Sequence, residues 1–61
     1  RAEVVLTVGA GALVRWTAAD GRLVREDRLL RGANRIDVSG MPPGLYIVHD
    51  AHGHVARVVV D

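Results

Sequence analysis

The sequence contains no cysteine, no phenylalanine and no lysine. Without cysteine, neither a disulfide framework nor a thiolate metal site can form. The only aromatic residues of the Phe, Trp and Tyr group are Trp16 and Tyr46, so aliphatic side chains must supply most of any core. No apolar run approaches the roughly 18 residues that are needed to span a bilayer as a helix.

A strong charge of one sign is also lacking. The eight arginines are mixed with seven acidic residues, and the formal net charge is +1. Such a mixture gives no long-range positive field for nucleic acid. Hydrophobic residues make up 49% of the chain, which argues against disorder. We expect one domain over residues 1–61, and the arginine start suggests a piece of a larger protein.

Short alternating or β-branched segments predict six strands. They lie at Glu3–Val8, Leu13–Ala18, Arg22–Leu30, Asn34–Val38, Leu45–His49 and Val55–Val60. Their period of two directs Val14 and Trp16 into the core. It also puts Ile36 and Val38 on one face of their strand, and Tyr46 and Val48 on one face of theirs. Six strands about ten residues apart, with turn residues between them, predict an all-β fold, a small β-sandwich.

The segment Arg22–Arg31 has two interpretations. Its Leu, Arg and Glu residues are good helix formers, and Asp20 and Gly32 stand where helix caps would stand. Asp20-Gly21, however, is the strongest hairpin signal in the chain, and Gly21 is expected at positive φ in a type I′ turn. We favour the strand because turn residues flank the segment on both sides.

Three groups of residues suggest chemistry, and each has a simpler interpretation. His49, His52 and His54 lie around a turn glycine with no cysteine nearby, so we expect surface histidines and neither a metal nor a cofactor. Ser39 lacks a nucleophile-elbow context, so a set with His49 and Asp50 is not expected to be catalytic.

Basic residues spaced by three form the third group. They would make one stripe on a helix, but a strand scatters them over both faces, beside Glu26 and Asp27. No nucleic-acid binding is therefore expected. We expect these charged side chains to lie in solvent on a strand or sheet edge, where they discourage aggregation. The residues are Arg22, Arg25, Arg28 and Arg31.

Four blocks follow one another from about Val14 to the end of the chain. They are Leu13-Val14-Arg15-Trp16 with Asp20-Gly21-Arg22-Leu23-Val24; Gly32-Ala33-Asn34-Arg35-Ile36-Asp37-Val38; Met41-Pro42-Pro43-Gly44-Leu45-Tyr46-Ile47-Val48; and Arg57-Val58-Val59-Val60. In order and spacing they resemble the type A C-terminal sorting domain of the type IX secretion system of Bacteroidetes. The Pro-Asn-Pro segment that usually opens these domains is missing, and Met41 and Arg57 stand where Leu and Lys are commoner.

This resemblance implies an immunoglobulin-like sandwich of about six to seven strands and no enzymatic activity. The domain would be the C-terminal fragment of a larger secreted protein, with its cargo N-terminal to Arg1. It would fold in the periplasm, bind the outer-membrane translocon and be removed by a sortase-like peptidase at the cell surface. The candidate recognition residues are Gly21, Gly44, Tyr46, Arg57, Val58, Val59, Val60 and Asp61.

Simpler roles compete with recognition at each of these residues. Gly21 and Gly44 fit turns, and Tyr46 fits a core position whose hydroxyl reaches a backbone partner. The strand Arg57–Asp61 has two possible roles. It could be an edge strand with a free carboxylate, to which a partner adds a strand. It could instead be a core strand that packs either Val58 and Val60, or Val59, inward.

Because the Pro-Asn-Pro segment is missing, the resemblance implies that a first strand has been removed or lies upstream. The loss of that strand predicts an open sheet edge and a dimer or strand swap through it. The alternative function is an accessory β-sandwich module of an extracellular enzyme, either carbohydrate-binding or a spacer. A solvent-exposed Trp16 would favour a carbohydrate-binding module.

Overall fold

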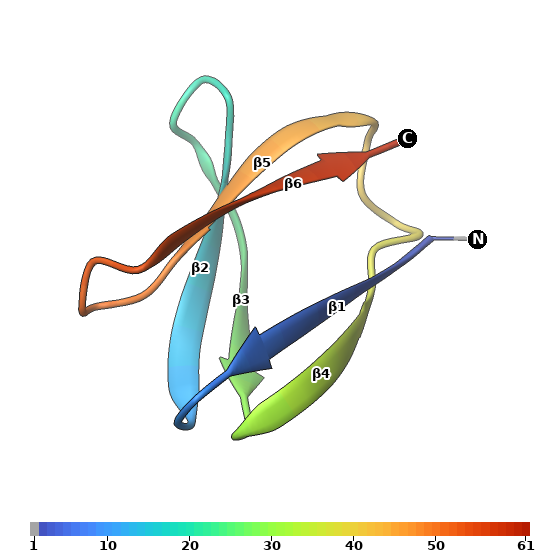
Figure 1. The fold of residues 1–61 in the computed structure, drawn as a ribbon. Helices are drawn as coiled ribbons and strands as arrows, with labels where there is room; N and C mark the ends of the chain where they lie inside the picture. The colour runs from blue at the N-terminus through green and yellow to red at the C-terminus, as the bar shows by residue number, and fades with distance from the viewer. Residues whose placement is uncertain (1) are drawn as a thin grey trace.

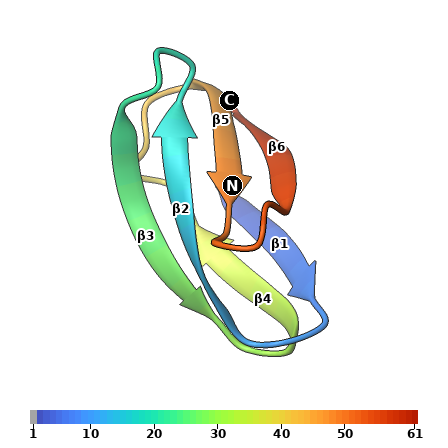
Figure 2. The same ribbon diagram turned by 90° about the vertical axis from the view of Figure 1, so that its left-hand side faces the viewer.

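The computed structural model describes residues 2–61, which form an all-β domain of six strands. These are β1 (Glu3–Val8), β2 (Ala12–Ala18), β3 (Leu23–Leu29), β4 (Gly32–Asp37), β5 (Gly44–His49) and β6 (Val55–Val60). Antiparallel pairing gives a two-stranded sheet, β1-β4, and a four-stranded sheet, β3-β2-β5-β6. The two sheets face each other as a small sandwich consistent with an immunoglobulin-like fold (Figures 1 and 2). No helix in residues 2–61 has the length and hydrophobicity to cross a membrane.

The ambiguous segment is the strand β3, so the helical interpretation is wrong. It pairs with β2 from Ala12 opposite Leu29 to Thr17 opposite Leu23, with a register shift between Trp16 and Thr17. Turn residues at both ends override the modest helix propensity of the segment.

The turn between β2 and β3 corrects one prediction. Gly21 has φ of 89°, but no residue other than glycine in residues 2–61 has positive φ, so Asp20 does not fit a type I′ turn. The N–H of Gly21 donates to the Ala18 carbonyl at 2.9 Å, and the N–H of Ala18 donates to the Arg22 carbonyl at 2.9 Å. The loop therefore has three residues, and its last is the left-handed glycine.

The core lies between the two sheets, and every buried residue among residues 2–61 is of a hydrophobic type. Trp16 is 0% exposed, and its ring meets the ring of Tyr46 edge to face, with centroids 6.5 Å apart at 64°. Every core position that alternation predicted is buried. The buried residues are Val14, Trp16, Leu29, Ile36, Val38, Tyr46, Val48, Val58 and Val60.

Arg25 packs over the core from β3, which the sequence did not indicate. Its guanidinium lies 5.7 Å from the centroid of the Trp16 ring, within cation–π range. It donates to the Asp27 carboxylate at 2.8 Å and to the Asp37 carbonyl at 3.1 Å. The side chain thus joins an edge of the larger sheet to the end of β4.

The connection from β4 to β5 crosses from one sheet to the other and is held by Tyr46. As predicted, the Tyr46 hydroxyl reaches the backbone and donates to the Pro42 carbonyl at 2.6 Å. A tyrosine that bonds to a backbone carbonyl a few residues upstream is typical of the corresponding corner in immunoglobulin-like sandwiches. Met41 is half-buried and packs against the core.

Candidate binding edge at the β1 and β6 opening

The sandwich has two open sides, each flanked by one strand of each sheet. One side lies between β3 and β4, and a cavity of about 210 Å³ there is lined mainly by polar residues. The other lies between β1 and β6 (Figure 2). Residues of both strands help to line a cavity of about 630 Å³. We call this second side the β1/β6 opening.

The two sides differ in charge. In β3 four of the seven residues are charged, and β4 adds Arg35 and Asp37. By contrast, β1 carries only Glu3 and β6 carries only Arg57. Charged side chains on an edge strand discourage pairing with another chain, and β6 largely lacks this protection. The unprotected edges are therefore the two that border the β1/β6 opening.

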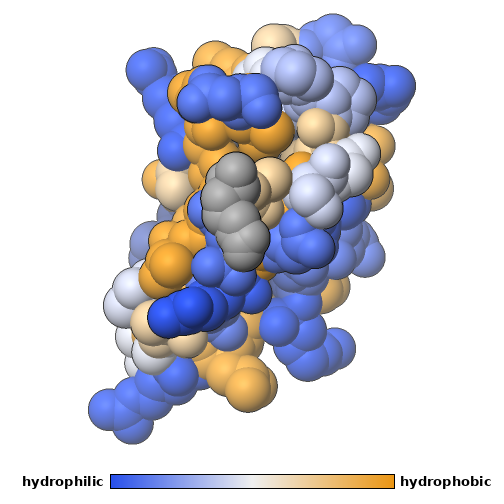
Figure 3. All heavy atoms as spheres, turned by 90° about the vertical axis from the view of Figure 1, so that its right-hand side faces the viewer, coloured by the Kyte–Doolittle hydropathy of each residue, from blue (hydrophilic) through white to orange (hydrophobic). Residues whose placement is uncertain are grey.

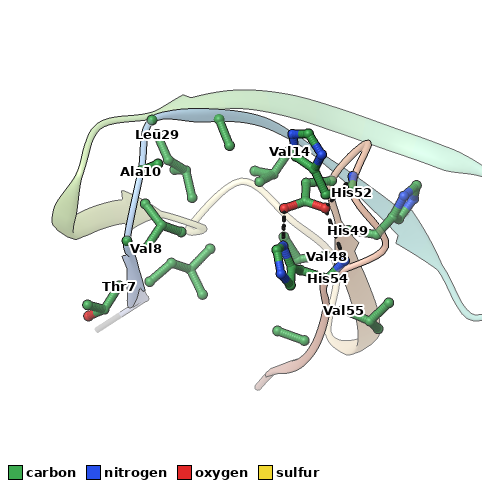
Figure 4. A pocket seen from close by; sticks show the side chains of 16 residues that line it. Thr7, Val8, Ala10, Val14, Leu29, Val48, His49, His52, His54 and Val55 are labelled. Atoms are coloured by element: carbon green, nitrogen blue, oxygen red, sulfur yellow. Dashed lines mark hydrogen bonds and ion pairs between the residues drawn. The ribbon is translucent and has the colours of Figure 1, made fainter.

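Apolar side chains line the cavity beneath the opening. The buried side chains of Val14, Leu29 and Val48 border it from the larger sheet, and Val8 approaches from β1 (Figure 4). The apolar lining of this cavity suits an extended apolar segment better than a charged one. On the side of the molecule opposite to the turn between β5 and β6, hydrophobic side chains gather in a band between hydrophilic ones (Figure 3).

A turn between β5 and β6 closes one end of the opening, and Asp50 organises it. The Asp50 Oδ1 atom accepts the N–H groups of His52 at 2.8 Å and His54 at 3.0 Å. The other oxygen, Oδ2, lies 2.8 Å from His54 Nδ1 (Figure 4, dashed lines). The hydrogen bond from the His54 side chain, with help from the two backbone N–H groups, lowers the pKa of Asp50 to about 2.

The pKa of Asp50 predicts an acid-sensitive turn. Because its value of about 2 lies below the ordinary 3.8, the charged carboxylate stabilises the fold above about pH 4, and this stabilisation is lost as pH falls through about 2. Replacing Asp50→Asn should flatten the loss of stability between pH 4 and 2, as measured by urea unfolding at each pH. Asp20→Asn is the matched control, since Asp20 also caps a turn but without histidine. An unchanged pH profile in the Asp50 variant would contradict this role.

The residues considered for chemistry do not come together. His49 lies on the far side of the turn from His54 (Figure 4). Within residues 2–61 no group of three or more His, Cys, Asp or Glu residues could hold a metal ion. Ser39 precedes β5, whereas His49 ends β5 and Asp50 follows it, so they stand at opposite ends of one strand. Glu26 and Asp27 pair separately, with Arg15 and Arg25.

Most of the candidate recognition residues gather at or beside β6. Val58 and Val60 are buried, whereas Arg57, Val59 and Asp61 are exposed. Gly44 and Tyr46 lie on β5 directly opposite Val60 and Val58, while Gly21 lies in the β2–β3 loop. The terminal strand is thus both a core strand and an edge strand.

Sequence reasoning missed two features of this region. The Asp50–His54 pair is four residues apart in a turn, and only the spacing of an acid and a histidine around Gly53 could have indicated it. The cavity depends on which strands share a sheet, which no local pattern reports.

No protein-family model matches the chain, and neither does any curated protein or solved structure. The resemblance to sorting domains therefore depends only on the four sequence blocks.

Proposed function

We propose that this domain is a secretion and sorting signal of the type IX system, recognised as a folded unit through its terminal strand. It performs no chemistry of its own. Its partners are the outer-membrane translocon, a sortase-like peptidase and an N-terminal cargo domain. Its route leads through the periplasm to the cell surface or beyond.

The observation that supports this proposal best is the state of β6. This strand forms one edge of the larger sheet, with β5 as its only strand partner among residues 2–61, and it has a single charged residue. Its outer face presents Arg57 and Val59 to solvent while its inner face holds the core. A partner can add a strand to such an edge without disturbing the fold.

A carbohydrate-binding role has no comparable support. Binders of this kind use exposed aromatic side chains, but Trp16 and Tyr46 are both buried. A spacer role would need no recognition surface at all, so the experiment on export also separates it from the proposal.

Export of a fused reporter tests the function. We expect a reporter with a signal peptide, followed by residues 1–61, to reach the surface of a Bacteroidetes cell that has a type IX system. Arg57→Glu should reduce the surface reporter about tenfold or more, because it reverses the only side-chain charge on the recognised strand. Deletion of Val58–Asp61 should abolish display.

Two controls separate recognition from folding. Arg28→Glu makes the same change at an exposed arginine on β3, and it should leave export unchanged. Circular dichroism of the purified Arg57 variant should show the wild-type unfolding midpoint, which the deletion will not, because it removes two buried valines. Wild-type display of either β6 variant would refute the proposed function.

A further inference from the structure

We infer that β6 is also a homodimerisation edge, through which two copies pair antiparallel with Arg57 of each copy opposite Asp61 of the other. Dimerisation uses the same strand as the proposed recognition but does not depend on it. The partner is a second copy of this chain, and the pairing has one register.

The edge itself is long and unprotected. All six residues of β6 pair with β5 on one side, and its other side has no strand partner among residues 2–61. It contains neither proline nor glycine, and its only charge is Arg57. The opposite edge of the same sheet, β3, has four charged residues. A second copy should therefore add at β6 and not at β3.

Backbone geometry limits the registers that two copies can adopt. Alternate residues of β6 direct their N–H and C=O groups towards β5, so only every second residue directs them outward. A symmetric antiparallel pair must place residues of the same parity opposite each other. One residue therefore faces its own copy, and the two-fold axis lies midway between the two. The candidates for this central residue are Arg57, Val58 and Val59.

Charge selects among these three registers. An axis at Arg57 places two guanidinium groups opposite each other, and an axis at Val58 places Arg57 opposite Val59. An axis at Val59 places Arg57 opposite Asp61 twice, and opposite charges in this position are stabilising. Neither side chain forms a hydrogen bond or ion pair among residues 2–61, so both are available.

The same register matches the two faces of the strand. Val58 and Val60 point inward and are buried, so pairing each with the other extends the apolar inner row across the axis. Val59 is 66% exposed on the outer face, where it would meet its own copy at the axis. Burial of this exposed valine would stabilise the dimer through the hydrophobic effect, in addition to the two ion pairs.

The register can be tested by reversing the charges of Arg57 and Asp61 and measuring the association of residues 1–61 by sedimentation equilibrium. We expect a concentration-dependent dimer in the wild type. Arg57→Glu and Asp61→Arg should each raise the dimer dissociation constant about tenfold or more, because two opposite-charge pairs become like-charge pairs. The double variant R57E/D61R should return to within about threefold of wild type, since both pairs are restored with inverted sign.

A substitution at the axis gives a second readout. Val59→Lys places two ammonium groups together and should abolish the dimer. The matched control is Val5→Lys on β1, where the valine is 56% exposed, and it should leave the dimer intact. Unfolding midpoints by circular dichroism verify that each variant is folded.

Three results would overturn the inference: a strictly monomeric wild type at millimolar concentration, a Val59→Lys variant that dimerises like wild type, or no recovery in the double variant. None of them bears on export. Conversely, a dimer whose fused reporter stays inside the cell would refute the proposed function and leave the dimer standing.

Discussion

Replacing Trp16→Ala should remove about half of the stability of this domain or more. Among residues 2–61, Trp16 is the only core residue with no exposed surface, and it contacts both Tyr46 and the guanidinium of Arg25. Removing a buried tryptophan costs about 3–5 kcal/mol. A domain of this size has a total stability of roughly 3–9 kcal/mol. Urea unfolding followed by far-ultraviolet circular dichroism measures the loss, since the fluorescent residue is gone.

Two further variants make this result specific. Trp16→Phe should lose much less, about 1–2 kcal/mol, because the indole Nε1 has no acceptor within residues 2–61 and the phenyl ring leaves no polar atom buried. Leu13→Ala changes the outer face of the same strand, where Leu13 is 43% exposed, and should change the unfolding midpoint little. A cooperative Trp16→Ala transition near the wild-type midpoint would show that the core is organised around other residues.

Replacing Tyr46→Ala should cost nearly as much, about 3–5 kcal/mol, for the same reason of lost core volume. Tyr46→Phe isolates the hydroxyl that donates to the Pro42 carbonyl, and it should cost about 1 kcal/mol. At about 4–8 °C per kcal/mol for a small domain, thermal unfolding resolves both variants.

The Tyr46 series also separates the two roles predicted for this residue. Because the side chain is buried, its effect on export should follow its effect on stability. Leu45→Ala, on the outer face of the same strand, is the neighbouring control for the stability measurement. A Phe variant that is as stable as wild type would show that the hydrogen bond to Pro42 does not secure the crossover between the sheets.

Alternation along the chain was sufficient to predict the strands and most of the core. Val14 with Trp16, Ile36 with Val38, and Tyr46 with Val48 follow from a period of two and from the turn residues between segments. The same reasoning identified β3 despite its helix-forming residues, because its flanking turns outweigh a propensity of a few tenths of a kcal/mol per residue.

Three features lay beyond local pattern. The sign of φ at Asp20 depends on how the hairpin closes, so the predicted type I′ turn was wrong, although Gly21 has the positive φ that was predicted. The inward position of Arg25 depends on Trp16 lying opposite it across the strand pair, and an arginine is ordinarily assigned to solvent. The partition of strands into sheets of two and four depends on pairings distant in sequence, such as that of Glu3 with Asp37.

The uneven distribution of charge between the two ends of the larger sheet limits what self-association can build. If two copies meet at β6, the outermost strands of the resulting eight-stranded ribbon are both β3, with four charged residues in seven. A two-fold contact occupies the β6 edge of each copy, and the two β3 edges that remain at the ends of this sheet repel a third copy. The larger sheet should therefore stop growing at two copies and not continue into a fibril.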